Sequence, residues 1–300
     1  MASRVFFLVS RDWLRITMKA GLAKLAVTCT LLAVLPGTPH AQAFQAPAQL
    51  ADIYARSVDK RLDLPADETQ RYGQMLQARL GEAGLEITRD QVVILVDRHP
   101  RVQALLMYWL PVQGAPVLLG ASPVSTGRAG GFEHFLTPLG VFEHSPANPD
   151  FRAEGTRNEH GIRGYGSKGL RVFDFGWQPA RKTWGDRAES VMRLQVHATD
   201  PDLLEPRLGS AQSKGCIRIP ASLNKLIDQF GLLDAAYEQA PAQGKAPWVL
   251  HPQRMPTPWS GRYLVVLQTE RAERPSWSPD PRPAKKSPSA RSGQDEPICA

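Results

Sequence analysis

Cys216 lies in a stretch whose residue types suit nucleophilic chemistry. It follows the small, flexible run Ser-Lys-Gly at residues 213–215 and opens the alternating stretch Cys-Ile-Arg-Ile at residues 216–219. In a strand, this alternation places the two isoleucines on one face and Cys216 with Arg218 on the other. A lone cysteine is often a small apolar core residue, but such a residue is expected on the isoleucine face. The pattern therefore predicts a thiol on the polar face of a strand.

His197 is the second residue that fits this chemistry, because it ends a stretch that alternates from Val191 onward. Arg193, Gln195 and His197 share the polar face of this predicted strand, and the apolar residues between them face the core. An imidazole near a thiol can take its proton and activate it for attack on a carbonyl. We therefore predict that Cys216 and His197 form a pair for acyl transfer.

The turn before Cys216 carries two further features that suit acyl transfer. Backbone N–H groups near Gly215 and Ser213 are predicted to point at the oxyanion that develops during attack on a carbonyl. Lys214 places positive charge near the thiol, which favours the thiolate. No second cysteine or close histidine pair accompanies Cys216, so neither a metal site nor a C-x-x-C oxidoreductase is predicted. We expect no metal and no cofactor.

Together with two earlier motifs, these residues resemble the L,D-transpeptidase catalytic domain, often called YkuD-like. That family's signature is a His-Gly-Thr strand end followed by a Ser-His-Gly-Cys-x-Arg or Asn turn, which stands here at residues 197–199 and 213–218. Residues 124–127 and 137–142 are similar to the family's Ser-Thr-Gly and Thr-Pro-x-Gly-x-Phe strands. The resemblance covers roughly residues 92–233 and leaves both ends of the chain unexplained.

The sequence departs from the family pattern at two positions. Ala198 replaces the glycine after the first histidine, and Lys214 replaces the histidine inside the second motif. The second departure leaves His197 as the only motif imidazole. His134 and His144 are candidate substitutes, but a lone loop histidine is more often a solvated or hydrogen-bonded side chain.

The resemblance implies a reaction on the peptide stems of peptidoglycan. The thiolate of Cys216 would attack the carbonyl of the L-centre of diaminopimelate, expel the terminal D-Ala and pass the acyl group to an amine. His197 would move the proton, and Arg218 would shape the turn or bind a substrate carboxylate. A third group would orient the imidazole, either a backbone carbonyl of the cysteine turn or Asp200. A carbapenem is the expected covalent inhibitor.

A glycine-rich segment over residues 160–169 lies between the two groups of motifs. Its backbone N–H groups could approach an anionic stem peptide, and Arg163 and Tyr165 are its candidate substrate-binding residues, together with Lys214. The alternative is a long hairpin loop whose glycines adopt positive φ. The segment lacks the spacing of a phosphate-binding loop.

Two other functions are compatible with the same residues. Water in place of the amine acceptor would give an L,D-carboxypeptidase or an amidase that hydrolyses peptidoglycan links. A non-catalytic peptidoglycan-binding module, which keeps the fold without the chemistry, is the alternative of another class, and the Lys214 departure is its support.

The first 43 residues are typical of a secretory signal peptide, with scattered Arg and Lys, an apolar run and a small-x-small cleavage site at residues 41–43. Met18 opens a signal peptide of ordinary length and is a candidate true start. The apolar run falls short of the roughly 20 residues that span a bilayer. We therefore predict export to the periplasm and no membrane span after cleavage.

Removal of residues 1–43 takes away five Lys/Arg and one Asp, so the net charge falls from +7 to +3. This balance gives no case for a nucleic-acid partner, which requires a concentrated basic face. Cys29 leaves with the leader, and Cys299 lies next to the C-terminus. We therefore expect no disulfide framework.

The pattern of short apolar runs predicts a mainly β fold with helices, an L,D-transpeptidase-like sandwich or barrel. A helix is expected directly after the cysteine motif, capped by Ser222 and ended by Gly231. The aromatic residues of 173–177 are expected on one packed face. The predicted strands cover residues 92–96, 102–110, 116–119, 141–142, 172–175, 191–196 and 263–267.

Three segments are expected beyond the leader. Residues 44–90 are predicted as a lead of two short helices, with Pro65 near one helix start and Gly84 as a stop. Residues 91–270 form the predicted catalytic domain. Residues 271–300 are rich in proline and poor in large apolar side chains, so they are predicted as a disordered tail.

Overall fold

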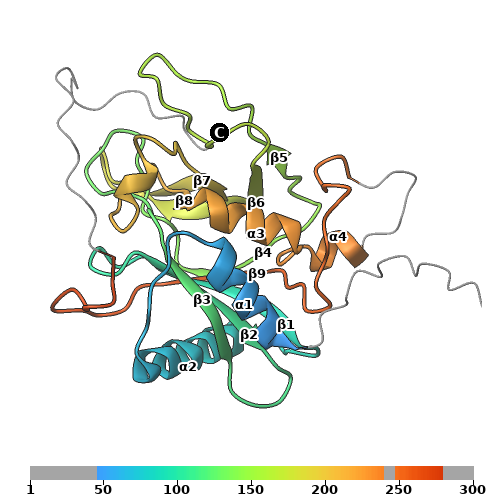
Figure 1. The fold of residues 1–300 in the computed structure, drawn as a ribbon. Coiled ribbons are helices and arrows are strands. Elements are labelled where there is room, and N and C mark those ends of the chain that lie inside the picture. The colour runs from blue at the N-terminus through green and yellow to red at the C-terminus, as the bar shows by residue number, and fades with distance from the viewer. Residues whose placement is uncertain (1–45, 240–246, 280–300) are drawn as a thin grey trace, which may run out of the picture. The chain divides into compact units, whose positions relative to one another are not determined.

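The computed structural model describes residues 46–239 and 247–279, so the predicted leader lies outside the described residues. The described chain is mainly β with helices, as predicted (Figure 1). Its elements are α1 (Pro47–Ser57), α2 (Ala66–Glu82), β1 (Gln91–Asp97), β2 (Ala104–Leu110), β3 (Val117–Pro123), β4 (Gly140–Glu143), β5 (Phe151–Arg152), β6 (Arg171–Arg181), β7 (Glu189–Ala198), the 3-10 helix η1 (Glu205–Arg207), β8 (Ile217–Ile219), α3 (Ala221–Gln229), α4 (Ala235–Gln239) and β9 (Tyr263–Leu267).

The described strands form two sheets, neither of which closes into a barrel. One sheet has the order β3-β2-β1-β9-β4 and the other the order β5-β6-β7-β8. A single apolar cluster takes residues from both sheets, including Ile94 of β1, Leu194 of β7 and Ile219 of β8. The sheets therefore pack on each other as a sandwich, with α1 and α3 contributing to the same core.

Strand β1 is apolar between its terminal residues Gln91 and Asp97, and both of its faces are buried. Val92, Ile94 and Val96 face the core between the sheets. Val93 and Leu95 face a second cluster, which the buried residues of α2 complete. Helix α2 therefore covers the outer face of the larger sheet (Figure 1), and the predicted helical lead is an integral part of the fold.

The helix boundaries confirm three predicted signals and correct one. Pro65 is the residue before α2, and Gly84 follows that helix with a φ of 70°. Gly231 follows α3 with a φ of 56°, where Leu232 N–H donates to the Ile227 carbonyl. Ser222 does not cap α3, because Pro220 precedes the helix and the Ser222 hydroxyl contacts Asp59 instead.

The predicted start of the disordered tail at residue 271 is wrong for residues 271–279. The two terminal nitrogens of the Arg271 guanidinium donate to the carboxylate of Glu68, at 2.7 and 2.5 Å. The buried ring of Trp277 packs edge-on against Tyr72 of α2, with 5.9 Å between ring centroids. The composition of this segment did not predict these contacts, because one ion pair and one aromatic residue suffice to hold a short, proline-rich segment. Residues 280–300 lie outside the described residues.

The predicted packed face of three aromatic residues on β6 is also wrong at its third member. Phe173 and Phe175 are buried, whereas Trp177 is 59% exposed. The β6–β7 register shifts between Asp174 and Trp177, and Gly176 has a φ of 76°. This bulge adds a residue to β6 and turns Trp177 to the outside.

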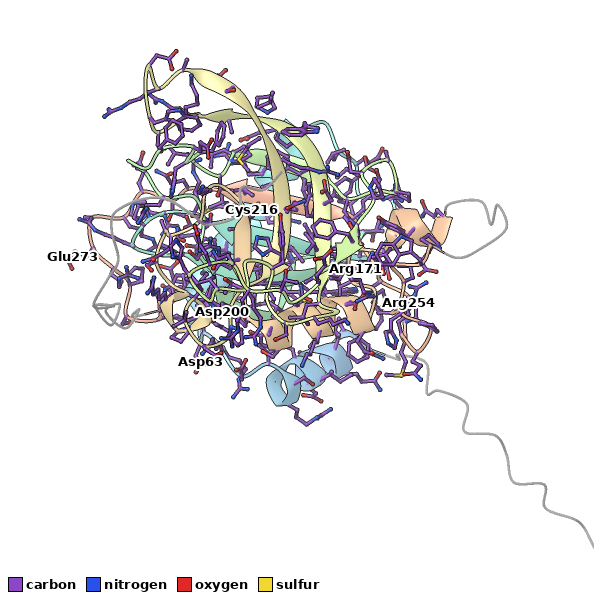
Figure 2. All side chains as sticks on the ribbon, turned by 90° about the horizontal axis from the view of Figure 1, so that it is seen from above. Asp63, Arg171, Asp200, Cys216, Arg254 and Glu273 are labelled. Carbon is purple, nitrogen blue, oxygen red and sulfur yellow. The ribbon has the colours of Figure 1, made fainter. Side chains whose placement is uncertain are left out.

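A buried ion cluster joins the smaller sheet to the segment that follows α3. Arg171 is fully buried, donates to Asp150 at 2.6 Å and holds both carboxylate oxygens of Asp234 at 2.7 and 3.0 Å. Asp234 also pairs with Arg254 at 3.6 Å, and both arginines are labelled in Figure 2. The Nε2 atom of His144 lies 2.8 Å from Asp150, so this histidine belongs to the cluster.

The charges of this cluster stabilise one another. Burial works against the charge of Arg171, but Asp234 and Asp150 raise its pKa above the ordinary value. Burial alone would raise the pKa of Asp150, and His144 and Arg171 lower it below the usual range.

Among the described helices, none combines the length and apolar character needed to cross a membrane.

Candidate active site

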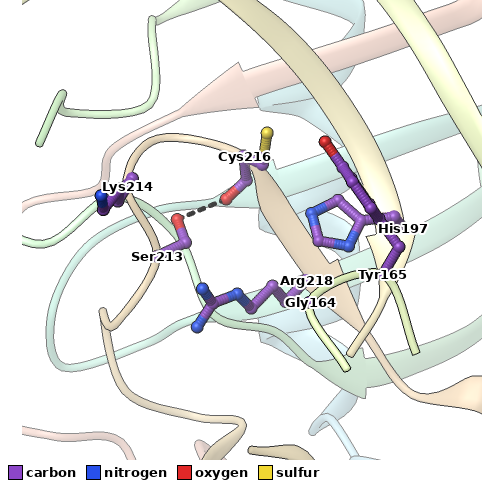
Figure 3. Close-up of a pocket in the computed structure, with 7 residues that line it drawn as sticks. All are labelled: Gly164, Tyr165, His197, Ser213, Lys214, Cys216 and Arg218. Atoms are coloured by element: carbon purple, nitrogen blue, oxygen red, sulfur yellow. Dashed lines mark hydrogen bonds between the residues drawn. The ribbon is translucent and has the colours of Figure 1, made fainter. Parts of the chain in front are cut away.

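The structure brings Cys216 and His197 to one pocket because β7 and β8 run parallel and side by side. His197 is paired with Arg218 across the two strands, and Cys216 stands directly before β8. Ile217 and Ile219 enter the core, as the alternation predicts. The pocket has a volume of about 10 Å³, room for about one water molecule (Figure 3). Its lining residues are Gly164, Tyr165, His197, Ser213, Lys214, Cys216 and Arg218.

The Ser-Thr-Gly segment at residues 125–127 clamps the cysteine turn by backbone hydrogen bonds. Ser125 and Arg218 exchange two of them, at 3.0 and 2.9 Å, and Ser213 N–H donates to the Thr126 carbonyl at 3.0 Å. A Cβ on Gly127 would lie 2.0 Å from the Phe135 carbonyl oxygen, so only glycine allows this approach. The motif thus has a mechanical task, to fix the turn that carries the thiol.

The side chains of Thr137 and Ser213 fix the turn from inside. The Thr137 hydroxyl donates to the Gly215 carbonyl at 2.6 Å. The Ser213 hydroxyl donates to the Cys216 carbonyl at 2.6 Å and accepts from Gly215 N–H at 3.1 Å. Gly215 has a φ of 141°, and a Cβ there would lie 2.6 Å from the Met192 sulfur. Ser213 therefore shapes the turn, and the oxyanion role of Gly215 stays a prediction, since its N–H is directed at Ser213 here.

The sulfur of Cys216 is buried against strand β7. It lies 3.8 Å from the Arg193 carbonyl oxygen and 3.9 Å from Oε1 of Gln195. Cys216 is disulfide-bonded in this structure, a bond that was not predicted from the sequence. The other cysteines of the chain, Cys29 and Cys299, both lie outside the described residues. Nucleophilic chemistry at Cys216 requires the reduced thiol.

His197 is held in the orientation that a general base requires. Its Nδ1 atom lies 2.6 Å from the Ala198 carbonyl oxygen, to which a protonated Nδ1 donates. This bond leaves Nε2 as the proton acceptor. The orienting group is thus a carbonyl of β7 itself, neither of the two predicted groups. Asp200 instead accepts from the backbone N–H groups of Arg163, Asp202 and Leu203.

Burial lowers the pKa of His197 to about 3; the hydrogen bond to the Ala198 carbonyl raises it in part, and the charge of Arg218 lowers it by a smaller amount. Desolvation disfavours the imidazolium, as does a cation on the neighbouring strand. The imidazole is therefore neutral near pH 7 with Nε2 open to a proton, and a pKa this low makes it a weak base. An imidazolium formed during a reaction would be a strong acid and would release its proton readily.

This low pKa predicts that His197 makes the protein less stable in acid. Between about pH 6.5 and pH 3 the unfolded chain binds a proton on His197 that the folded chain excludes, so stability falls as the pH falls. We expect a loss of about 2 to 3 kcal/mol between pH 7 and pH 4.5 from this residue. Urea unfolding at both pH values checks it, because His197→Gln removes that part of the loss. An equal loss in the variant would contradict the assignment.

Of the other predicted substrate-binding residues, Tyr165 and Lys214 line the pocket and Arg163 does not. Tyr165 packs edge-on against the His197 ring, with 4.7 Å between ring centroids, and lines the pocket. Lys214 also lines the pocket and pairs with Glu133 at 3.7 Å, which offsets part of its charge. Arg163 does not line it, and its guanidinium lies 3.8 Å from the Asp200 carboxylate.

A wide groove adjoins the closed pocket. Its volume is about 1000 Å³, and it shares Gly164, Tyr165 and Lys214 with the pocket. The glycine-rich loop contributes Ile162, Gly164, Tyr165 and Gly166 to its wall, and residues 151–159 contribute a larger part. The substrate-rim role of that loop stays a prediction. Phe151 and the largely exposed Trp248 add aromatic surface to the same groove.

Sequence reasoning gave Gln195 no role, although it placed this residue on the same strand face as His197. Gln195 is fully buried behind the thiol. Its position two residues before His197 was the available signal, since residues i and i+2 share a face. Its partner Asp174 on β6 carried no signal, because a register across two strands cannot be read from local spacing. In the described part of the chain, no cluster of His, Cys, Asp and Glu fits a metal ion.

Comparisons with known proteins give a distant structural likeness and no match in sequence. No protein-family model matches the chain, and no curated protein matches it. Among solved structures, it is similar to the K307A mutant of the helical cell shape determining protein Pgp2 from Campylobacter jejuni, with 12% identity and a TM-score of 0.28. The match covers 69% of this chain and 58% of that one, less than two thirds of the Pgp2 chain. A likeness this distant carries no argument about function.

Proposed function

We propose that this protein is an exported cysteine acyltransferase of the L,D-transpeptidase type, which acts on peptidoglycan stem peptides in the periplasm. The observation that carries the proposal is the shared pocket of Cys216 and His197 at the ends of two parallel strands. The four motif segments that resemble the family meet around this pocket and hold its turn. A non-catalytic binding module would have no need for such a fixed thiol and imidazole.

The proposed first half of the reaction forms a thioester. Nε2 of His197 takes the proton of the reduced Cys216 thiol as the sulfur attacks the carbonyl of the L-centre of diaminopimelate. The tetrahedral intermediate collapses when the bond to the nitrogen of D-Ala breaks and the imidazolium gives that nitrogen its proton. The low pKa of His197 favours this transfer, because the imidazolium is a strong acid.

The second half transfers the acyl group. An amine attacks the thioester carbonyl, His197 takes the amine's proton, and the sulfur leaves and recovers a proton. Water in place of the amine gives hydrolysis by the same steps. The outcome depends on which acceptor reaches the thioester, and that acceptor must come through the groove or the rim of the pocket.

The groove beside the pocket fits a stem peptide, which carries both carboxylates and a free amine. Arg157 supplies positive charge, and Glu154 and Glu159 supply negative charge along the same wall. A peptide lying in the groove would reach Cys216 past Tyr165 and Lys214, which border both spaces. The pocket itself is too small for the scissile group, so Tyr165 or its loop must shift for the reaction.

Product analysis tests the proposal. The chain from Phe44 onward, fully reduced, is incubated with disaccharide tetrapeptide, and the products are resolved by mass. We expect cross-linked dimers with loss of D-Ala, undiminished in Cys299→Ala and absent in Cys216→Ala. Release of D-Ala without dimers would indicate the hydrolase. Absence of both products, with a Cys216 that a carbapenem does not acylate, would overturn the enzyme assignment.

A further inference from the structure

A chain of buried polar groups leads from β6 to the back of the thiol pocket. Asp174 of β6 stands directly opposite Gln195 of β7 in the sheet, and both side chains are fully buried. The Asp174 carboxylate accepts from Nε2 of Gln195 and from Nε of Arg193, each at 2.7 Å. Its other oxygen accepts from Gly176 N–H at 2.8 Å, which the β6 bulge brings into position.

This arrangement fixes which end of the Gln195 carboxamide faces the pocket. A carboxylate only accepts hydrogen bonds, so it binds the NH₂ group and would repel the carboxamide oxygen. The oxygen must therefore point the other way, where it accepts from the Tyr165 hydroxyl at 3.1 Å and lies 3.9 Å from the Cys216 sulfur. Neither Asp174 nor Gln195 lines the pocket, so both act from behind it.

We propose that Asp174 and Gln195 are positioning residues for the thiol: Asp174 orients the Gln195 carboxamide, whose oxygen holds the Cys216 thiol and the Tyr165 hydroxyl in their reactive places. The catalytic role of this positioning rests on the proposed function. Its effect on the protonation of the thiol rests on the geometry alone. The negative end of the carboxamide dipole favours the protonated thiol, which keeps Cys216 neutral beside the neutral imidazole until attack.

The other charged and titratable groups around the sulfur come from β8, β7, the cysteine turn and the segments that carry Glu133 and Tyr165. Arg218 on β8 and Lys214 in the turn favour the thiolate, and Glu133 offsets part of the Lys214 charge. His197 on β7 is neutral near pH 7, since burial holds its pKa at about 3. Burial and the charge of Asp174 raise the pKa of the Tyr165 hydroxyl, so it remains a donor. The Gln195 oxygen thus favours the protonated thiol, whereas the two cations favour the thiolate.

The pH dependence of thiol alkylation tests this inference without any substrate. The reduced protein is treated with iodoacetamide across a pH series, and modification of Cys216 is followed by peptide mass. Gln195→Met keeps the side-chain length and removes the acceptor, so we expect the pH midpoint to fall by roughly one pH unit. In Tyr165→Phe the Gln195 oxygen loses the tyrosine hydroxyl as a donor and serves the thiol alone. We therefore expect the pH midpoint to rise, by less than it falls in Gln195→Met. Gln178→Met, the same substitution on β6 away from the pocket, is the matched control and should leave the midpoint unchanged.

A loss of packing alone would not move the two midpoints in opposite directions. An unchanged or raised midpoint in Gln195→Met, or a shift in the same direction in both variants, would overturn the inference. Acylation by the stem peptide supplies a separate readout, where we expect Gln195→Met to be about tenfold slower although its thiol is more acidic. If the wild-type protein forms no acyl-enzyme at all, the proposed function fails, and the alkylation midpoints still decide the positioning role.

Discussion

Replacement of His197 by alanine is expected to slow acylation of Cys216 by about 10²- to 10⁴-fold, the usual contribution of a general acid–base group. The structure gives this residue both halves of the proton transfer. Its Nδ1 is engaged with the Ala198 carbonyl, so Nε2 accepts the thiol proton, and burial makes the resulting imidazolium a ready donor. The rate is measured by quenched-flow sampling and intact-protein mass spectrometry, with a carbapenem as the acylating reagent.

The control for this variant is His251→Ala. His251 is exposed, its Nδ1 accepts a hydrogen bond from Gln253 N–H at 3.2 Å, and it does not line the pocket. It should acylate at the wild-type rate. A His197→Ala protein that acylates within about threefold of wild type would remove the imidazole from the mechanism, because even a weak general base contributes more than that.

Replacement of Arg171 by methionine is expected to lower the free energy of unfolding by about 3 to 5 kcal/mol, the cost of leaving buried charges without their partner. Arg171 is fully buried and is bound to both Asp150 and Asp234. Its removal leaves two buried carboxylates, and Met cannot donate to either. Urea unfolding at pH 7 measures the loss.

The control is Arg262→Met, which breaks an ion pair at the surface. Arg262 pairs with Glu143 at 3.2 Å, and the Glu143 side chain is half exposed. Surface pairs contribute about 0 to 1 kcal/mol, so this variant should be nearly as stable as wild type. Equal losses in the two variants would contradict the special role assigned to the buried cluster.

The positions of most strands along the chain and the strand faces of Cys216 and His197 were predictable because they depend on local alternation and apolar runs. The period-two pattern before His197 and after Cys216 assigned each side chain to the correct face, and the core residues of β7 and β8 confirm it. The long apolar runs of β1 and β2 were predicted equally well, since a strand buried on both faces needs no alternation.

The features that were missed depend on contacts between distant segments. Asp174 meets Gln195 only through the register of two strands, and a bulge next to it turns Trp177 outward. Arg271 and Trp277 are anchored by Glu68 and Tyr72, which precede them by some two hundred residues in the chain. The orienting carbonyl of His197 was missed because any backbone carbonyl can accept, and sequence does not show which one lies within reach.

The central claim is that Cys216 forms a thioester with a peptidoglycan stem, and trapping that intermediate tests it most directly. The reduced protein from Phe44 onward is mixed with disaccharide tetrapeptide, quenched in acid within seconds and examined by intact mass and peptide mapping. We expect an adduct equal to the donor less D-Ala, on Cys216 and not on Cys299, and missing in Cys216→Ala. An unmodified Cys216 in wild-type protein that releases D-Ala, or an adduct that persists in Cys216→Ala, would contradict the account.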